Sequence, residues 1–200
     1  KGAGVVDNAV AAINNDANNK WITATKVADG NNTIANVTSQ ALTGGNAGVG
    51  GITNTDYVDA MSAFETRRFN FFALDGATDA SLQTSVKAWI ERLRSEGKGV
   101  VAVMGGSVTD DQTPATANSR STGFNYEGVI NVGVSGIMDG VTYSSAQVAC
   151  WVAGKAAGQA LSESLTYAVT PFDDVTPRLT HNQVVAGLQA GTLLLVHDGE

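Results

Sequence analysis

The sequence predicts an α/β fold, with a mostly parallel β-sheet and helices on both of its faces. Between residues 53 and 161, short apolar runs alternate with longer segments in which apolar residues recur every three or four positions. The short runs are typical of strands covered on both sides, and the longer segments are typical of amphipathic helices. Strands and helices in alternation form parallel sheets with right-handed crossover connections.

The composition suits one domain with part of a second. The chain has 200 residues, of which 43% are hydrophobic and 16% are charged, so it can bury a sizeable core. Its formal net charge of −7 argues against general affinity for nucleic acid or anionic membranes, because their phosphates attract clusters of Lys and Arg. The single cysteine, Cys150, excludes an internal disulfide framework. No apolar run approaches the roughly 18 residues of a membrane span.

The first part of the chain gives a weak pattern. Residues 1–41 are rich in Asn and Ala, and Val5–Ile13 is compatible with either a short helix or a strand. Trp21–Val27 alternates like an edge strand that ends at an Asp29–Gly30 turn.

The clearer elements begin at residue 53. Thr53 and Asp56 have the spacing of a capping box and predict the start of a helix. Phe69–Leu74 predicts a buried strand that ends at Asp75–Gly76. The apolar face of the helix consists of Tyr57, Ala60, Met61 and Phe64.

A long helix and a second strand follow. Asp79–Glu96 has acidic and hydroxyl residues at its start and arginines near its end, and Gly97 can terminate it. Val100–Met104 predicts another buried strand. The apolar stripe of the helix consists of Leu82, Val86, Trp89, Ile90 and Leu93.

The next segments predict a loop, a strand and a helix. Gly105–Gly128 is polar with almost nothing to bury, so we expect a long surface loop. Val129–Val134 predicts a third strand, and Ser144–Leu161 predicts an Ala-rich helix. Gly154 and Gly158 are expected to let this helix approach the sheet or a neighbouring helix closely.

The residues beyond Pro171–Pro177 predict the truncated start of a C-terminal α+β module. Thr180 and Gln183 form a second capping box, for a short helix that ends near Gly191. Leu193–Val196 predicts a strand that leads into a hairpin turn, whose returning strand is absent. Because the chain also begins without Met, we expect a piece of a longer protein.

The glycine-rich residues 44–51 raise the hypothesis of a phosphate-binding loop. A Walker-type loop needs a Lys and a Ser or Thr after its last glycine, whereas Ile52, Thr53 and Asn54 follow here. A dinucleotide-binding loop directly follows a buried strand, and residues 36–41 make a poor strand. Asp56 would also repel phosphate. A flexible connector into a capped helix fits better, and no cofactor is predicted.

Ser135 and the pair Ser144–Ser145 are candidates for a hydrolase nucleophile. Ser135 lies in only part of a G-x-S-x-G motif, while Ser144–Ser145 begins an Ala-rich helix, as in subtilisin-type enzymes. Those enzymes have their His before the Ser, and here both histidines, His181 and His197, come after it. Without an imidazole nothing takes the hydroxyl proton. A serine helix cap is therefore favoured, and no catalytic residue is predicted.

No metal site is predicted either. Asp110–Asp111 and Asp173–Asp174 have no His or Cys nearby, and each pair predicts a solvated turn, with weak calcium binding left open. Two histidines alone do not make a zinc site. Cys150 lies in the apolar stretch Val148–Val152 and predicts a buried, inert thiol.

Two other classes of function remain open. An α/β hydrolase-like or ligand-binding domain would have its site at the carboxyl ends of the strands, in the loops after Leu74, Met104 and Val134. That hypothesis predicts converging polar groups and a deep pocket. A surface or adhesion module is compatible with the Asn-rich start and the acidic charge, which are unspecific.

The order of the segments resembles that of contractile-tail sheath proteins. Leu42–Gly45, Thr55–Ala60 and Phe64–Glu65 are similar to the start of the sheath's middle domain, where a glycine run leads into the first helix. The following strands and helices come in the order of that family.

The most specific similarity lies later in the chain. Ala153–Gly158 together with Ser164–Tyr167 resembles a segment of the sheath proteins of PBSX-like prophages and R-type bacteriocins. Leu179–Thr180 and Gly191–Leu195 resemble the beginning of the family's C-terminal domain.

This resemblance implies a subtilisin-like middle domain without a protease triad, in a structural protein that is not an enzyme. It divides the chain into a poorly defined N-terminal part (1–41), the sheath middle domain (42–178) and the start of the C-terminal domain (179–200). The implied function is that of a subunit of the contractile tail sheath of a bacteriophage or phage-tail-like particle. The implied location is the virion tail, assembled in the bacterial host cytoplasm.

The resemblance also implies the partners. The full-length protein polymerises with other sheath subunits around the tail tube protein, and terminal arms add strands to the sheet of a neighbouring subunit. Because those arms lie outside this chain, we expect residues 1–200 to be monomeric, without a nucleic-acid partner or membrane insertion. Gly105–Gly128 is longer than in close relatives and is expected on the sheath exterior.

Overall fold

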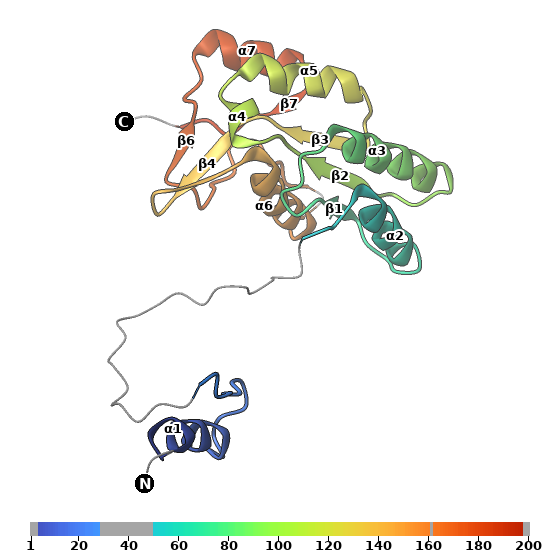
Figure 1. Cartoon of the computed structure of the whole chain (residues 1–200). Helices are drawn as coiled ribbons and strands as arrows, with labels where there is room; N and C mark the ends of the chain where they lie inside the picture. Colours follow the sequence, from blue (N-terminus) through green and yellow to red (C-terminus); the bar gives the residue numbers. More distant parts are fainter. Residues whose placement is uncertain (1–3, 29–49, 161, 198–200) are drawn as a thin grey trace. The chain divides into compact units, whose positions relative to one another are not determined.

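The computed structural model describes residues 4–28, 50–160 and 162–197. The chain divides into two compact units, Lys1–Gly50 and Gly51–Glu200, and each is described by itself (Figure 1). The expected glycine run at 44–49 and the Asp29–Gly30 turn lie outside the described residues.

The N-terminal unit consists of helix α1 (Gly4–Asn14) and an extended segment after it. Of the two alternatives for Val5–Ile13, the helix is confirmed. The edge strand expected at Trp21–Val27 is wrong, because that segment has no strand pairing. Its backbone is held by a side chain instead, since Asn14 donates to the oxygen of Ala24 at 2.9 Å and accepts from its nitrogen at 2.8 Å.

The second unit is built on a parallel sheet with the strand order β1-β2-β3-β7. The parallel sheet that the sequence predicts is confirmed. Successive side chains of a strand point to opposite faces, and β2 shows this directly. Ala102 and Met104 pack in one core with Leu82 and Ile90, whereas Val103 packs in a second core. The strands are β1 (Phe71–Ala73), β2 (Val101–Met104), β3 (Val129–Val132) and β7 (Thr192–Leu193).

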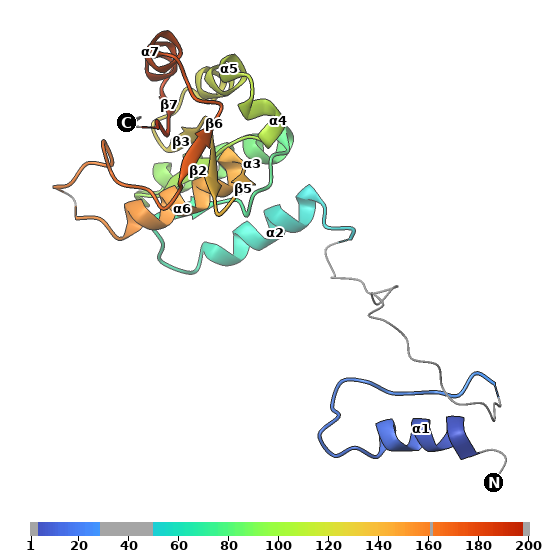
Figure 2. The same cartoon turned by 90° about the vertical axis from the view of Figure 1, so that its left-hand side faces the viewer.

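Helices cover both faces of this sheet. Helix α6 (Ser145–Ala157) contacts β1, β2 and β3 from one side, while α3 (Ala80–Ser95) contacts β2 within the other core (Figures 1 and 2). Helix α2 (Asn54–Phe64) packs on α3. The capping boxes predicted at Thr53 and Thr180 are confirmed, and so is the α3 helix, whose start Asp79 caps by accepting from the nitrogen of Leu82.

Gly105–Gly128 is not the surface loop that the sequence predicts. It contains α4 (Val108–Asp111) and α5 (Pro114–Phe124), and α5 packs on β3. Ser107 caps α4, Pro114 occupies the first turn of α5, and the inward side of α5 buries Ala117 and Ser121. The prediction failed because small and polar side chains form this inward face, so no apolar stripe reveals the helix.

A second, antiparallel sheet was missed. Its strand order is β5-β4-β6, formed by β4 (Ser135–Met138), β5 (Val141–Tyr143) and β6 (Asp174–Thr176). Asp139 and Gly140 join β4 to β5 with φ values of +52° and +74°. A two-residue Asp-Gly turn between apolar residues is a strong hairpin signal, so this hairpin was readable from the sequence.

The tail packs against the rest of the second unit. Helix α7 (His181–Gln189) packs on α5, and β7 pairs in parallel with β3 as a strand of the main sheet. Leu195 belongs to the core that α6 covers. The backbone at Gly133 lies close to β7. A Cβ at this position would lie 2.4 Å from a methyl carbon of Thr192, so a larger residue would hinder the docking of the tail.

Two expectations about α6 are also corrected. Its last helical residue is Ala157, with Gly158 as the C-cap, so the helix ends before residue 161. Gly154 has no atom within 4 Å of an added Cβ, and Gly158 meets only backbone oxygens of its own helix. These glycines therefore do not provide a close approach to the sheet or to another helix within the described residues.

The docking of the tail gives a first prediction. Leu195→Ala is expected to lower the free energy of unfolding of the second unit by about 2–5 kcal/mol, because the side chain is buried. Val196→Ala is the matched control and should change it by less than about 0.5 kcal/mol, since Val196 is 57% exposed. Urea unfolding followed by tryptophan fluorescence measures both. Equal effects of the two variants would show that the tail is not part of this core.

Candidate functional site

The carboxyl edge of the parallel sheet is where an α/β enzyme would hold its site. In this chain the start of α6 lies directly against the residues that follow β2. The nitrogen of Gly106 donates to Oγ of Ser145 at 2.7 Å, and the nitrogen of Ala146 donates to the oxygen of Gly106 at 3.1 Å. A Cβ on Gly105 would lie 2.2 Å from the carbonyl carbon of Ser145. The expected pocket position is therefore occupied by packed backbone.

A buried carboxylate ties this edge together. Asp111 has no exposed surface. Its Oδ1 accepts from Oγ of Ser145 at 2.6 Å, and its Oδ2 accepts from Oγ of Ser135 and from the nitrogen of Ser145, each at 2.7 Å. Asp111 therefore connects α4 to the start of α6 and to β4. The expectation of a solvated turn at Asp110–Asp111 is wrong for Asp111, because one turn of helix points it inward.

A cation lies close to this carboxylate. The half-buried side chain of Arg120 donates from Nε to Oδ1 of Asn131 at 2.7 Å and from a terminal nitrogen to the oxygen of Val132 at 3.2 Å. Burial lowers the pKa of Arg120 below its ordinary value, and the charges of Asp111 and Asp110 oppose this shift. A buried charge is tolerated when hydrogen bonds and an opposite charge surround it.

The serines of this edge are hydrogen-bonded and enclosed. Ser144 is the N-cap of α6, in a capping box with Gln147, as the sequence predicts. Ser135 and Ser145 have no exposed surface, and both hydroxyls donate to Asp111. Each hydroxyl proton is thus donated to the buried carboxylate of Asp111, and not to an imidazole as in a Ser-His-Asp triad.

The histidines lie elsewhere. His181 is exposed at the first turn of α7, and Nδ1 of His197 lies 3.6 Å from Oδ1 of Asp174. Asp174 also forms a two-point ion pair with Arg178, which is the main cause that lowers the pKa of Asp174 to about 2. Within the described ranges the side chains of Ser144 and Ser145 bond to Gln147, Asp111 and Gly106, and neither imidazole is among their partners.

The other predicted positions are placed as follows. Asp56 accepts from the nitrogen and the hydroxyl of Thr53, at 2.7 and 2.8 Å, and so acts as a helix cap. Cys150 is exposed on α6, so the expectation of a buried thiol is wrong. In the part of the chain that the structure describes, no three His, Cys, Asp or Glu residues gather as metal ligands, and no helix has the length and apolar character to cross a membrane.

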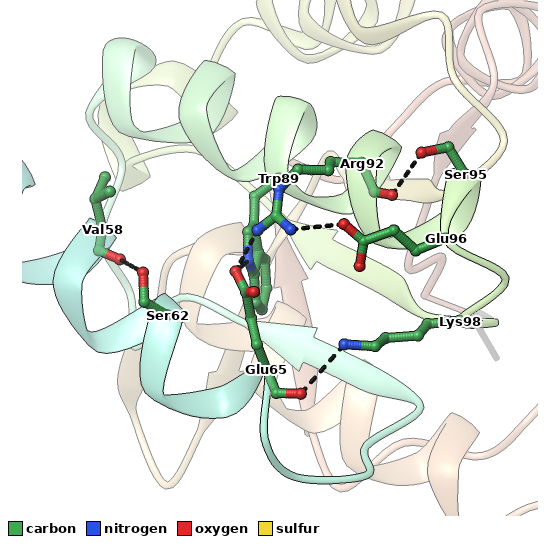
Figure 3. Close-up of polar contacts among 8 residues, drawn as sticks. All are labelled: Val58, Ser62, Glu65, Trp89, Arg92, Ser95, Glu96 and Lys98. Atoms are coloured by element: carbon green, nitrogen blue, oxygen red, sulfur yellow. Dashed lines mark hydrogen bonds and ion pairs between the residues drawn. The ribbon is translucent and has the colours of Figure 1, made fainter.

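A second polar cluster fastens α2 to α3 (Figure 3). Glu65, the C-cap of α2, accepts from Nε1 of Trp89 at 2.8 Å and from the guanidinium of Arg92. Arg92 also bonds Glu96 at 2.8 Å, and Nζ of Lys98 donates to the backbone oxygen of Glu65 at 3.2 Å. The ring of Trp89 stacks on that of Phe69 with a centroid distance of 5.6 Å.

Comparison with known proteins identifies the family. Residues 50–200 match the family described as phage tail sheath protein central domain. This chain belongs to the phage tail sheath family. The family consists of structural phage proteins, which accords with the enclosed carboxyl edge.

Individual relatives agree with this assignment. Protein XkdK of the phage-like element PBSX of Bacillus subtilis is 34% identical over 149 residues, which are 72% of this chain and 28% of XkdK. A sheath tail protein of Desulfitobacterium hafniense has a similar crystal structure, with a TM-score of 0.64 and 34% identity over 85% of this chain and 38% of the other. A sheath tail protein of Listeria innocua has a TM-score of 0.61 at 25% identity, over 90% of this chain and 36% of the other. The chain thus spans less than a third of XkdK.

The buried carboxylate gives a second prediction. Asp111→Asn is expected to lower the free energy of unfolding by about 3 kcal/mol, because an amide NH₂ would then face one of the hydrogen-bond donors. Asp59→Asn, on the exposed surface of α2, is the control and should change it by less than about 0.5 kcal/mol. Chemical denaturation measures both. Similar stability of the two variants would contradict the structural role of Asp111.

Glu65 gives a third prediction, on pH. Hydrogen bonds from Arg92 and then from Trp89 lower the pKa of Glu65 below its ordinary 4.5. The folded chain therefore binds this proton less readily than the unfolded chain. The resulting stabilisation is complete above the unfolded pKa and is lost as the pH falls through the folded pKa.

The measurement compares the wild-type chain with Glu65→Gln from neutral pH down to about pH 3. The wild type should be the more stable at neutral pH, and the difference should shrink once the pH falls below 4.5, the ordinary pKa of Glu65. A difference that stays constant over this range would show that the carboxylate charge does not hold α2 on α3.

Proposed function

We propose that this chain is part of a structural subunit of a contractile tail sheath. In this proposal the full-length protein polymerises around the tail tube protein and changes from an extended to a contracted lattice, which drives the tube through a cell envelope. The observation that carries the proposal is the similarity to a sheath tail protein structure over 85% of the chain at 34% identity.

The physical character of the second unit supports this role. A sheath subunit must act as a rigid body that transmits force, and two cores on opposite faces of the sheet supply that rigidity. A difference of about a few kcal/mol per subunit between two lattices, multiplied over many subunits, would supply the work. Such a mechanism requires neither a bound cofactor nor a chemical step at the moment of contraction.

The finer assignments are part of the same proposal. Residues 42–178 form the sheath middle domain, residues 179–200 begin the C-terminal domain of the full-length protein, and residues 1–41 belong to its N-terminal part. The protein has no catalytic activity, its partners are other sheath subunits and the tube, and it is assembled in the host cytoplasm. In this proposal β7, which pairs with β3, is a strand of the C-terminal segment that extends the sheet of the middle domain.

Electron microscopy of the full-length protein tests this function, and it gives the fourth prediction. We expect stacked rings or tubes of the full-length protein, because it contains the segments on which polymerisation depends. Residues 1–200 alone should scatter light as a monomer.

Two outcomes would contradict the proposal. A full-length protein that stays a dispersed monomer while it hydrolyses ester or nucleotide substrates would favour the enzyme hypothesis. A stable ring or filament of residues 1–200 would show that the missing segments are not required for polymerisation.

A further inference from the structure

The side of the parallel sheet where the strands end and the side where they begin carry opposite charges. At the carboxyl edge, α2 and α3 both begin, and β1 and β2 both end. The side-chain nitrogen of Asn54 donates to Oδ1 of Asp79 at 2.7 Å, which holds the start of α2 beside the start of α3. We name the carboxylates of this region the acidic edge, which consists of Asp56, Asp75, Asp79 and Asp110.

The negative charge of the acidic edge is only weakly balanced by neighbouring cations. Hydrogen bonds from Ser81, Leu82 and Asn54 lower the pKa of Asp79 to about 2, and those from Thr53 lower the pKa of Asp56. Arg120, half-buried, is the cation that faces Asp110 here. Asp75 is exposed and appears in no ion pair among the described residues.

The opposite end of the sheet is basic. There α2 and α3 end and β1 and β2 begin, and five basic side chains lie beside four glutamates. All four glutamates are already paired: Glu65 and Glu96 with Arg92, Glu127 with Arg94, and Glu91 with Lys87. The five basic residues, which we name the basic edge, are Arg67, Arg68, Arg92, Arg94 and Lys98.

Two arginines of the basic edge stay available. Arg67 and Arg68 are exposed and have no ion pair within the described part of the chain. Next to them, Phe64 is 47% exposed although its ring contacts Phe69 and Phe72. An exposed aromatic ring beside unpaired arginines is the composition that protein interfaces favour.

We propose that Arg67 and Arg68 of one copy dock on the acidic edge of a second copy, so that subunits contact head to tail along the strand direction. This inference rests on the proposed function, because it names one of the surfaces through which sheath subunits would meet. A contact between two different surfaces is heterologous, and when its rotation does not close a ring it repeats indefinitely, as a stacked assembly requires. A second copy fits because every copy presents both complementary charges.

The proposed contact between the two edges is weak, because its charged side chains are exposed to solvent. Each exposed ion pair contributes little, and salt screens it. Isolated chains therefore associate only weakly, in keeping with the expected monomer. Within a polymer, other contacts raise the effective concentration of the two edges, and the same weak contact then forms.

Zero-length cross-linking tests the contact directly. In an Arg67→Lys/Arg68→Lys variant of the whole chain, a carbodiimide joins the introduced amines to carboxylates that they touch. We expect cross-linked peptides that pair residues 67–68 with Asp56, Asp75 or Asp79 at low salt. Mixing ¹⁴N- and ¹⁵N-labelled chains shows which links are intermolecular. Links mainly to Glu163 or Asp173, links within one chain only, or no links at residues 67–68 would each overturn the proposal.

Charge reversal supplies the matched control. Arg67→Glu/Arg68→Glu and Lys20→Glu/Lys155→Glu change the net charge equally, but only the first alters residues of the basic edge. Lys155 is exposed on α6, and Lys20 is exposed in the N-terminal unit. With each variant measured alone at low salt in static light scattering, copies of the first should no longer attract one another, and copies of the second should. Equal behaviour would assign the attraction to net charge and overturn the proposal.

The result separates this inference from the proposed function. If the full-length protein forms tubes and the Arg67→Glu/Arg68→Glu variant forms them equally well with unchanged salt resistance, the head-to-tail contact is wrong while the sheath function stands. If an unrelated acidic protein is cross-linked in preference to a second copy, the partner is wrong.

Discussion

The hydrogen bonds of the Asp111 carboxylate are the constraint on which the rest of the second unit depends. The carboxylate holds the start of α6 and the start of β4 against α4. Helix α4, β4 and the start of α6 all lie where β2 and β3 end. One buried charge therefore fixes the position of α6, the helix that covers one face of the sheet. Glycines at 105 and 106 make this arrangement possible, because a larger residue at 105 would collide with the α6 backbone.

This constraint also explains why the edge lacks the form of an active site. In an α/β enzyme, the loops beyond the strands leave a crevice in which substrate meets polar groups. Here the same loops are closed over their own polar groups, and Ser135, Ser145 and Asp111 satisfy one another out of contact with solvent. Because this edge attaches parts of the unit to one another, the unit is a rigid body, which suits the proposed role in a sheath.

The sequence revealed the elements whose side chains differ sharply between their two faces. The α3 helix and strands β2 and β3 bury apolar residues, and β1 half-buries two phenylalanines, so periodicity and run length located them. Helix α5 remained hidden because its inward residues are Ala117 and Ser121, which carry no hydrophobic signal. The β4–β5 hairpin could have been found from Asp139–Gly140, whereas the pairing of β7 with β3 spans some sixty residues and depends on tertiary packing alone.

The candidate site shows the same limit more strongly. Ser144 was predictable as a cap because capping is local. The burial of Asp111 was not, because its partners Ser135 and Ser145 come from elements 24 and 34 residues further along the chain. Adjacent carboxylates look alike in a sequence, and only the packing of α4 decides that Asp110 caps a helix while Asp111 enters the core.

Native-state hydrogen exchange of the amides of Gly106, Ser145 and Ala146 tests the central claim most directly. All three donate across the closed edge. If the edge is a permanent internal attachment, these amides exchange only when the whole unit unfolds, as slowly as those of β2 and β3. Fast exchange of these amides by a local opening, while the strands stay protected, would reveal an accessible cleft and contradict the account.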